Sequence, residues 1–204
     1  MGFIAENGTL VMLEDEVLAT DTMAPEIVAD MLATARVAGE SRNLGVVLCG
    51  VRSAYIERTD AAFRSEVDIY YHELAAVEDL GAVDDDVLKI AVYDFDGSEQ
   101  GTATFFEPYR DTHQVVVSGQ HWVDLMNAGV HKGSGIDLLR ERLGLGRDQC
   151  VAFGDYLNDL QMLEAVDHSY AMANAHPDIL AVAAYIAPAN TEHGVVTALE
   201  QLLA

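Results

Sequence analysis

The chain has 204 residues, and 50% of them are hydrophobic, so it can bury the core of one large domain or of two small ones. Its 34 acidic and 11 basic residues give a formal charge of -23, which repels nucleic acids and anionic membrane surfaces. No apolar run approaches the length of a membrane span, and no leader-like segment opens the chain. Cys49 and Cys150 lie in apolar runs without a metal-binding spacing, as reduced thiols do, and we therefore expect a cytoplasmic protein.

The first part of the chain predicts a hairpin followed by a helix. Apolar runs at residues 3–5 and 9–11 flank an Asn-Gly turn that begins at Asn7. Residues 24–37 carry apolar side chains at helical spacing, with a proline near the start, where a helix tolerates it.

The middle of the chain, residues 21–124, is typical of a separate α/β unit. Its expected elements are strands at 44–49, 53–56, 88–93, 115–118 and 122–126, a mixed helical stretch at 61–71, and acidic loops at 78–86. Arg52, between the first two strands, is a candidate contact for an anionic group because a guanidinium suits such groups. The alternative is an ordinary arginine at a strand edge.

A helical pattern over residues 132–143 begins at Lys132. A lysine at the start of a helix places a point charge on a phosphate, while the backbone donors of the helix N-terminus point at the same group. Lys132 is therefore a candidate phosphate-binding residue.

The most informative stretch is Gly154-Asp155-Tyr156-Leu157-Asn158-Asp159, which follows the apolar run at residues 151–153 and precedes another helical pattern. A buried strand that ends in Gly-Asp holds its carboxylates at the C-terminal edge of a sheet, where open α/β folds bind ligands. Asp155 and Asp159 can converge there on one hard cation, and Mg²⁺ prefers one or two carboxylates together with a substrate phosphate. The alternative is that Asp155 caps the helix and Asp159 lies on its solvated face.

Several motifs follow one another in the last third of the chain. They are Lys132-Gly133, the Gly154–Asp159 stretch, Met172-Ala173-Asn174-Ala175-His176, and a closing Asn190 followed by Gly194-Val195. In this order they resemble the C-terminal half of the haloacid dehalogenase (HAD) superfamily, specifically the Cof-type phosphatases of subfamily IIB. The resemblance implies Mg²⁺-dependent hydrolysis of a small phosphorylated metabolite through an aspartyl-phosphate.

The resemblance also implies roles for individual residues. Lys132 stabilises charge on the phosphate, and Asp155 and Asp159 hold Mg²⁺. The implied substrate-binding residues are Asn7, Arg52, Asn174 and Asn190.

The implied architecture is an α/β fold with an incomplete, doubly wound Rossmann-like core, residues 1–20 and 125–204, and an inserted α/β cap, residues 21–124. Family members begin with a strand that ends in Asp-x-Asp-Gly-Thr, whose first Asp is the nucleophile. No such strand precedes residue 1, and we therefore expect a chain that starts inside its core domain, at an internal methionine, with little or no phosphatase activity. The alternative is a non-catalytic homodimer that associates through the uncovered sheet edges and helix faces.

A further alternative rests on the run Asp94-Phe95-Asp96-Gly97-Ser98, which resembles the nucleophile motif itself. Asp94 would then be the nucleophile, Asp96 the acid/base and Ser118 the phosphate-holding residue of a rearranged phosphatase. Residues 95–117 show only a weak helical pattern where the doubly wound core needs a full crossover helix. The spacing therefore favours a place in the cap for this run.

Overall fold

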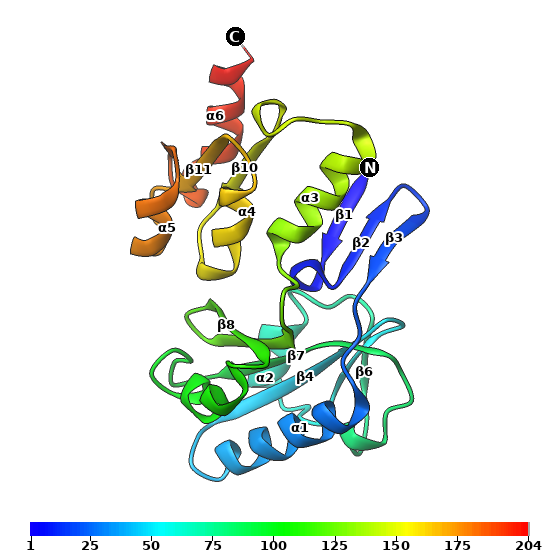
Figure 1. Ribbon diagram of the computed structural model, residues 1–204. Coiled ribbons are helices and arrows are strands. Elements are labelled where there is room, and N and C mark those ends of the chain that lie inside the picture. Colours follow the sequence, from blue (N-terminus) through cyan, green and yellow to red (C-terminus); the bar gives the residue numbers. More distant parts are fainter. Residues whose placement is uncertain (204) are drawn as a thin grey trace. The chain divides into compact units, whose positions relative to one another are not determined.

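The computed structural model describes residues 1–203, which separate into two compact units (Figure 1). The first unit consists of residues 1–19 and of the chain from Val130 onward, and the second of Thr20–Gly129. Both units combine strands and helices, and the mixed α/β class expected from the sequence is confirmed.

The first unit contains two small sheets, β1-β2-β3 and β10-β11-β12, of which the second is parallel. Its strands are β1 (Gly2–Ala5), β2 (Leu10–Leu13), β3 (Glu16–Thr20), β10 (Val151–Gly154), β11 (His168–Met172) and β12 (Tyr185–Ala187). Its α-helices are α3 (Lys132–Leu143), α4 (Leu160–Glu164), α5 (Pro177–Val182) and α6 (Gly194–Leu202). Its 3₁₀ turns are η1 (Glu6–Gly8), η4 (Arg147–Gln149), η5 (Leu157–Asp159) and η6 (Asn190–Glu192).

The predicted hairpin is present, because β1 and β2 pair antiparallel around η1. Helix α3 lies between this hairpin and α4 (Figure 1). Two glycines allow the close packing on both sides. A Cβ on Gly133 would lie 2.4 Å from the carbonyl oxygen of Gln161 in α4, and one on Gly135 would lie 2.7 Å from Ile4 in β1.

We expect Gly133→Ala to lower the free energy of unfolding by about 2 kcal/mol, because the added methyl group forces apart two backbones that cannot repack by a rotamer change. Chemical denaturation followed by circular dichroism measures the effect. Gly39→Ala in the second unit is the matched control, since its Cβ would meet only side-chain atoms at 3.8 Å or more. An equal change in the free energy of unfolding in the two variants, relative to the wild-type chain, would contradict the packing argument.

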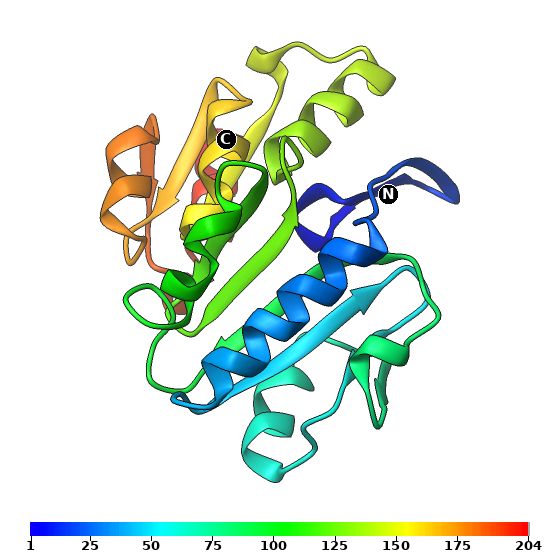
Figure 2. The same ribbon diagram turned by 60° about the horizontal axis from the view of Figure 1, so that its bottom comes forward.

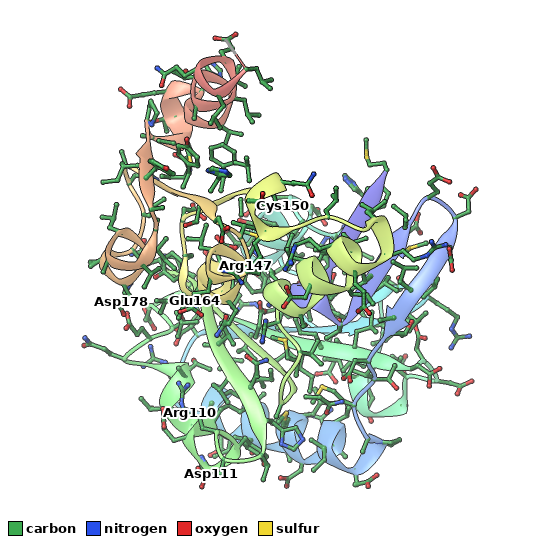
Figure 3. All side chains as sticks on the ribbon, turned by 45° about the horizontal axis from the view of Figure 1, so that its top comes forward. Arg110, Asp111, Arg147, Cys150, Glu164 and Asp178 are labelled. Atoms are coloured by element: carbon green, nitrogen blue, oxygen red, sulfur yellow. The ribbon has the colours of Figure 1, made fainter. Side chains whose placement is uncertain are left out.

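The core around the parallel sheet of the first unit includes Ala152, Leu163, Val166, Ala171 and Ile179, and it extends to Ala198 in α6. Arg147, in the turn before β10, ties this turn to the segment after α4. Its guanidinium donates to the carbonyl oxygen of Glu164 and to Asp167 Oδ1, the latter at 3.2 Å (Figure 3). The parallel strands bring their carboxyl ends to one edge of the sheet.

The second unit contains a six-stranded sheet in the order β6-β5-β4-β7-β9-β8. Its strands are β4 (Leu44–Gly50), β5 (Ala54–Ile56), β6 (Leu74–Ala76), β7 (Val87–Asp94), β8 (His113–Gly119) and β9 (Trp122–Asn127). Its helices are α1 (Pro25–Gly39), α2 (Ala61–Val67) and the 3₁₀ helices η2 (Leu80–Ala82) and η3 (Thr102–Tyr109). Figure 2 shows α1 lying across one face of this sheet.

Three features of the second unit differ from the sequence-based expectation. Helix α2 ends at Val67 rather than at residue 71, and the short strand β6 was not expected. The expected boundary at residue 124 lies inside β9, which pairs with both β7 and β8 and so belongs wholly to the second unit. Short strands without a run of β-branched residues carry too little periodicity to be recognised.

Among residues 1–203, no helix combines the length and the apolar character that crossing a membrane requires. Cys49 is buried, with its thiol 3.6 Å from the Tyr71 hydroxyl, and Cys150 is half-buried, with its thiol 3.4 Å from the carbonyl oxygen of Gly146.

Candidate functional site

The start of α3 and the loop after β10 meet through an ion pair. Lys132 Nζ donates to Asp159 Oδ1 at 2.6 Å. The Asp159 side chain is 7% exposed and that of Lys132 is 28% exposed, so the carboxylate is buried while the ammonium still reaches solvent. The pair therefore holds a cationic group at the first turn of a helix, whose free backbone donors favour an anion at the same place.

The second oxygen of Asp159 organises the loop itself. Asp159 Oδ2 accepts hydrogen bonds from the backbone amides of Asp155 at 2.9 Å and of Tyr156 at 3.3 Å. Gly154 is required here, because a Cβ on it would lie 2.6 Å from Asp159 Cβ. Asp159 Oδ1 thus binds Lys132 and Oδ2 binds the two amides, and the role of Asp159 as a cation ligand beside Asp155 stays a prediction.

Asp155 is half-buried at the carboxyl end of β10. Burial and the negative charge of Asp159 raise the pKa of its carboxyl group, and the nearby Lys132 ammonium acts in the opposite direction. A carboxylate that is desolvated beside a like charge gains stability from a bound cation.

The chemistry of the donors fits a cation only if substrate supplies further ligands. Among residues 1–203, no third His, Cys, Asp or Glu joins the two aspartates in a cluster that could hold a metal ion. Mg²⁺ is compatible with this donor set, since it is commonly held by one or two carboxylates, water and a substrate phosphate. Asp155 is the residue that would hold it.

The loops after β11 and β12 reach the same edge of the parallel sheet as Asp155. Asn174 Oδ1 accepts a hydrogen bond from the backbone amide of Asn190 at 3.1 Å, and both residues are exposed. The backbone amide of His176 donates to the carbonyl oxygen of Asp155 at 2.9 Å. The structure thus brings Asp155, Asn174 and Asn190 to one sheet edge, as the motif order suggested.

Two residues near Lys132 have roles that the sequence did not reveal. His131 caps α3, because its Nδ1 accepts from the Ser134 amide at 3.0 Å while Ser134 Oγ accepts from the His131 amide at 3.1 Å. Histidine is not among the preferred capping residues, so no helix-start rule selects it. Asn158 donates from Nδ2 to Asn7 Oδ1 at 3.1 Å and links the loop to the β1–β2 hairpin.

Arg52 lies apart from these residues in sequence and belongs to the second unit. Its Nε lies 3.3 Å from Asp85 Oδ1, and its side chain is 65% exposed. It lines a cavity of about 890 Å³, whose other lining residues include Leu32, Leu48 and Leu80. Nothing in the second unit by itself connects Arg52 to a phosphate.

Asp94, at the end of β7, is wholly buried in the second unit. Its Oδ2 accepts from Arg42 Nε at 2.6 Å and from Thr102 Oγ1 at 2.5 Å, and its Oδ1 accepts from the Asp96 amide at 2.9 Å. Asp96 is exposed, and between the two aspartates and Ser118 the chain forms the 3₁₀ helix η3 rather than a crossover α-helix. The contacts of Asp94 are those of a structural anchor.

A sequence model of the haloacid dehalogenase-like hydrolases matches residues 1–199. The chain belongs to this family. All 204 residues also align with the 5-amino-6-(5-phospho-D-ribitylamino)uracil phosphatase of Escherichia coli, at 31% identity over 206 positions and 74% of the length of that enzyme. The resemblance found in the motifs is therefore confirmed, and its family makes this protein a HAD-type phosphatase.

Solved structures agree on the fold. SMU.1108c of Streptococcus mutans superimposes with a TM-score of 0.86 at 24% identity, over 100% of this HAD chain and 77% of its own. The HAD subclass IIB sugar phosphatase BT4131 superimposes with a TM-score of 0.84 at 21% identity, over 98% and 75% of the two chains. The Rossmann-like HAD fold is thus the fold of this protein.

Proposed function

We propose that the first unit carries the phosphate site of a Mg²⁺-dependent phosphomonoester phosphatase. The observation that carries this proposal is the network in which Asp159 holds both the Lys132 ammonium and the amides of Asp155 and Tyr156. The network sets a cation, a helix N-terminus and a half-buried carboxylate beside the carboxyl end of a parallel strand. That combination suits a dianionic phosphoryl group that shares a metal ion with the protein.

Each residue has a distinct part in this proposal. Lys132 binds a phosphoryl oxygen and neutralises charge that develops there. Asp159 fixes the position of Lys132 through Oδ1 and holds the loop through Oδ2, and its part as a second metal ligand stays a prediction. Asp155 holds the metal, and a bound Mg²⁺ supplies charge neutralisation of the phosphoryl group. Asn174 and Asn190 border the phosphate from the neighbouring strand ends.

The substrate class follows from the relatives. The Escherichia coli relative is named for a ribitylamino-uracil phosphate, and a further relative, the HMP-PP phosphatase of Serratia proteamaculans, is 40% identical over 62 residues, which are 30% of this chain and 23% of that enzyme. We therefore infer a small phosphorylated metabolite, with the second unit, residues 20–129, acting as the cap and Arg52 as a cap contact with substrate. A cytoplasmic location stays a prediction.

The proposal includes weak catalysis by residues 1–204. A covalent route needs a carboxylate nucleophile opposite Lys132, and no third acidic side chain joins Asp155 and Asp159 among residues 1–203. Asp94 is buried in the second unit with both oxygens engaged, and we assign it a structural role. The remaining charge stabilisation supports only a small residual rate.

Hydrolysis of an aryl phosphate with and without Mg²⁺ tests the proposal. We expect at most slow turnover, which is lost in Asp155→Asn and which persists, per folded molecule, in Asp94→Asn. Rapid turnover that disappears in a folded Asp94→Asn variant would make Asp94 the nucleophile and overturn the assignment. Glu99→Gln, at an exposed site five residues from Asp94 and without a part in either catalytic scheme, is the matched control.

Self-association is a second candidate function, and it is favoured by exposed apolar side chains on α6. Val196 is 55% exposed and Leu202 is 42% exposed, and Ile186 in the neighbouring β12 is 64% exposed. Parallel sheets and their helices are normally covered on both faces. A homodimer through α6 predicts a concentration-dependent mass in sedimentation that Val196→Asp abolishes, whereas a monomer at all concentrations contradicts it.

A further inference from the structure

The turn between β1 and β2 has an unusual backbone. Glu6, Asn7 and Gly8 have φ angles of 45°, 58° and 102°, so three successive residues lie in the left-handed region. Only glycine adopts this region freely, and a non-glycine residue there costs about 1–3 kcal/mol, which the surrounding structure must offset. Such strain is concentrated at functional sites, and the contacts of the turn indicate which site it serves.

The turn is fixed against the start of α3. Thr9 is fully buried, and its Oγ1 donates to the carbonyl oxygen of Glu6 at 3.0 Å. A Cβ on Gly8 would lie 2.4 Å from the carbonyl oxygen of His131, so the backbones of the turn and of the residue before Lys132 touch. The turn and the start of α3 are therefore packed directly against each other.

Asn7 connects the same turn to the loop after β10. It is 9% exposed, and its Oδ1 accepts from Asn158 Nδ2 at 3.1 Å. Asn158 immediately precedes Asp159, whose carboxylate binds Lys132 and the amides of Asp155 and Tyr156. The turn thus contacts both halves of the proposed phosphate site, one through Gly8 and the other through Asn7.

We propose that Asn7 is a positioning residue, whose carboxamide fixes Asn158 and so holds the Asp155–Asp159 loop in register with Lys132. This inference rests on the proposed function of the first unit as a phosphate site. It gives Asn7 a role different from the substrate contact expected from the sequence, because its carboxamide is directed to another loop of the protein. Asparagine suits the position, since it tolerates the left-handed conformation and supplies the acceptor.

Three variants separate the side chain from the backbone. Asn7→Gly keeps the left-handed φ without strain but removes the side-chain acceptor. Asn7→Asp keeps the left-handed φ and also keeps a side-chain acceptor. Glu14→Gly is the matched control, because Glu14 is an exposed left-handed residue, with a φ of 55°, in the turn between β2 and β3.

Amide hydrogen exchange of Asp155 and Tyr156 in the full chain is the first readout. We expect Asn7→Gly to exchange about fivefold faster at these two amides, the effect of losing one ordinary hydrogen bond, with near-normal exchange in Asn7→Asp and Glu14→Gly. Unchanged exchange in Asn7→Gly, or an equal increase at all amides of the first unit, would overturn the positioning role.

Affinity for inorganic phosphate in the presence of Mg²⁺, measured by ³¹P NMR, is the second readout. The positioning role predicts a loss of about fivefold in Asn7→Gly that Asn7→Asp recovers. A loss of equal size in both variants would make Asn7 a direct contact and contradict the proposal. If the wild-type chain binds no phosphate, the proposed function fails, and the exchange measurement alone decides whether Asn7 positions the loop.

Discussion

Asp94→Ala is expected to lower the free energy of unfolding of the second unit by about 3 kcal/mol. The substitution removes a fully buried carboxylate and leaves Arg42, Thr102 and the Asp96 amide without their acceptor. Breaking a buried ion pair on one side costs about 3–5 kcal/mol, and the lower end applies because the Arg42 side chain is 23% exposed. Urea denaturation combined with amide exchange in β7 measures the loss.

Asp96→Ala is the matched control, since Asp96 is exposed two residues away. It is expected to change stability by less than about 0.5 kcal/mol. If Asp94→Ala were as stable as this control, the anchoring role would be wrong, and the alternative that Asp94 is a catalytic nucleophile would again be open.

The same carboxyl group makes stability depend on pH. Burial alone would raise the pKa of Asp94, but hydrogen bonds from Arg42, Thr102 and the Asp96 amide lower it below its ordinary value. A carboxyl group with a lowered folded-state pKa stabilises the fold above its unfolded pKa of about 3.9, and this contribution is lost as the pH falls further. Asp94→Asn should therefore flatten the decline of stability below about pH 4.

Asp159→Ala is expected to destabilise the first unit by about 3 kcal/mol and to weaken phosphate binding at the same time. Two backbone amides lose a buried acceptor, at about 1–3 kcal/mol each, and Lys132 loses the carboxylate that holds its ammonium. Denaturation of the variant and titration with inorganic phosphate measure the two effects.

Asp178→Ala is the control for Asp159, because Asp178 is exposed at the start of α5 (Figure 3). Asp178→Ala should change neither the free energy of unfolding nor the phosphate affinity appreciably. A variant Asp159→Ala that kept full phosphate affinity would show that Lys132 needs no partner, and the proposed network would not be the site.

The elements with strong periodicity could be predicted from the sequence. The β1–β2 hairpin, α1, α3 and β10 lie where the apolar spacing and the Asn-Gly turn put them. The two short strands β3 and β6 were missed, and α2 was expected to be longer. Short elements depend on pairing partners distant in the chain, which local patterns do not contain.

The candidate site could be predicted in its residue types but not in their contacts. The motifs selected Lys132, Asp155 and Asp159, yet the direction of the Asp159 carboxylate depends on a lysine 27 positions away in the sequence. Asn158 and His131 act through hydrogen bonds that no spacing rule encodes. The Asp94 run shows the converse, because it matches a catalytic pattern while its side chain is buried among structural partners.

Titration of the full chain with inorganic phosphate in the presence of Mg²⁺, followed by ³¹P NMR, tests the central claim most directly. The account predicts saturable binding that falls at least about tenfold in Lys132→Met and in Asp155→Asn, while Asp94→Asn binds normally per folded molecule. Absence of saturable binding, or equal affinity in Lys132→Met and the wild-type chain, would contradict a phosphate site at the start of α3.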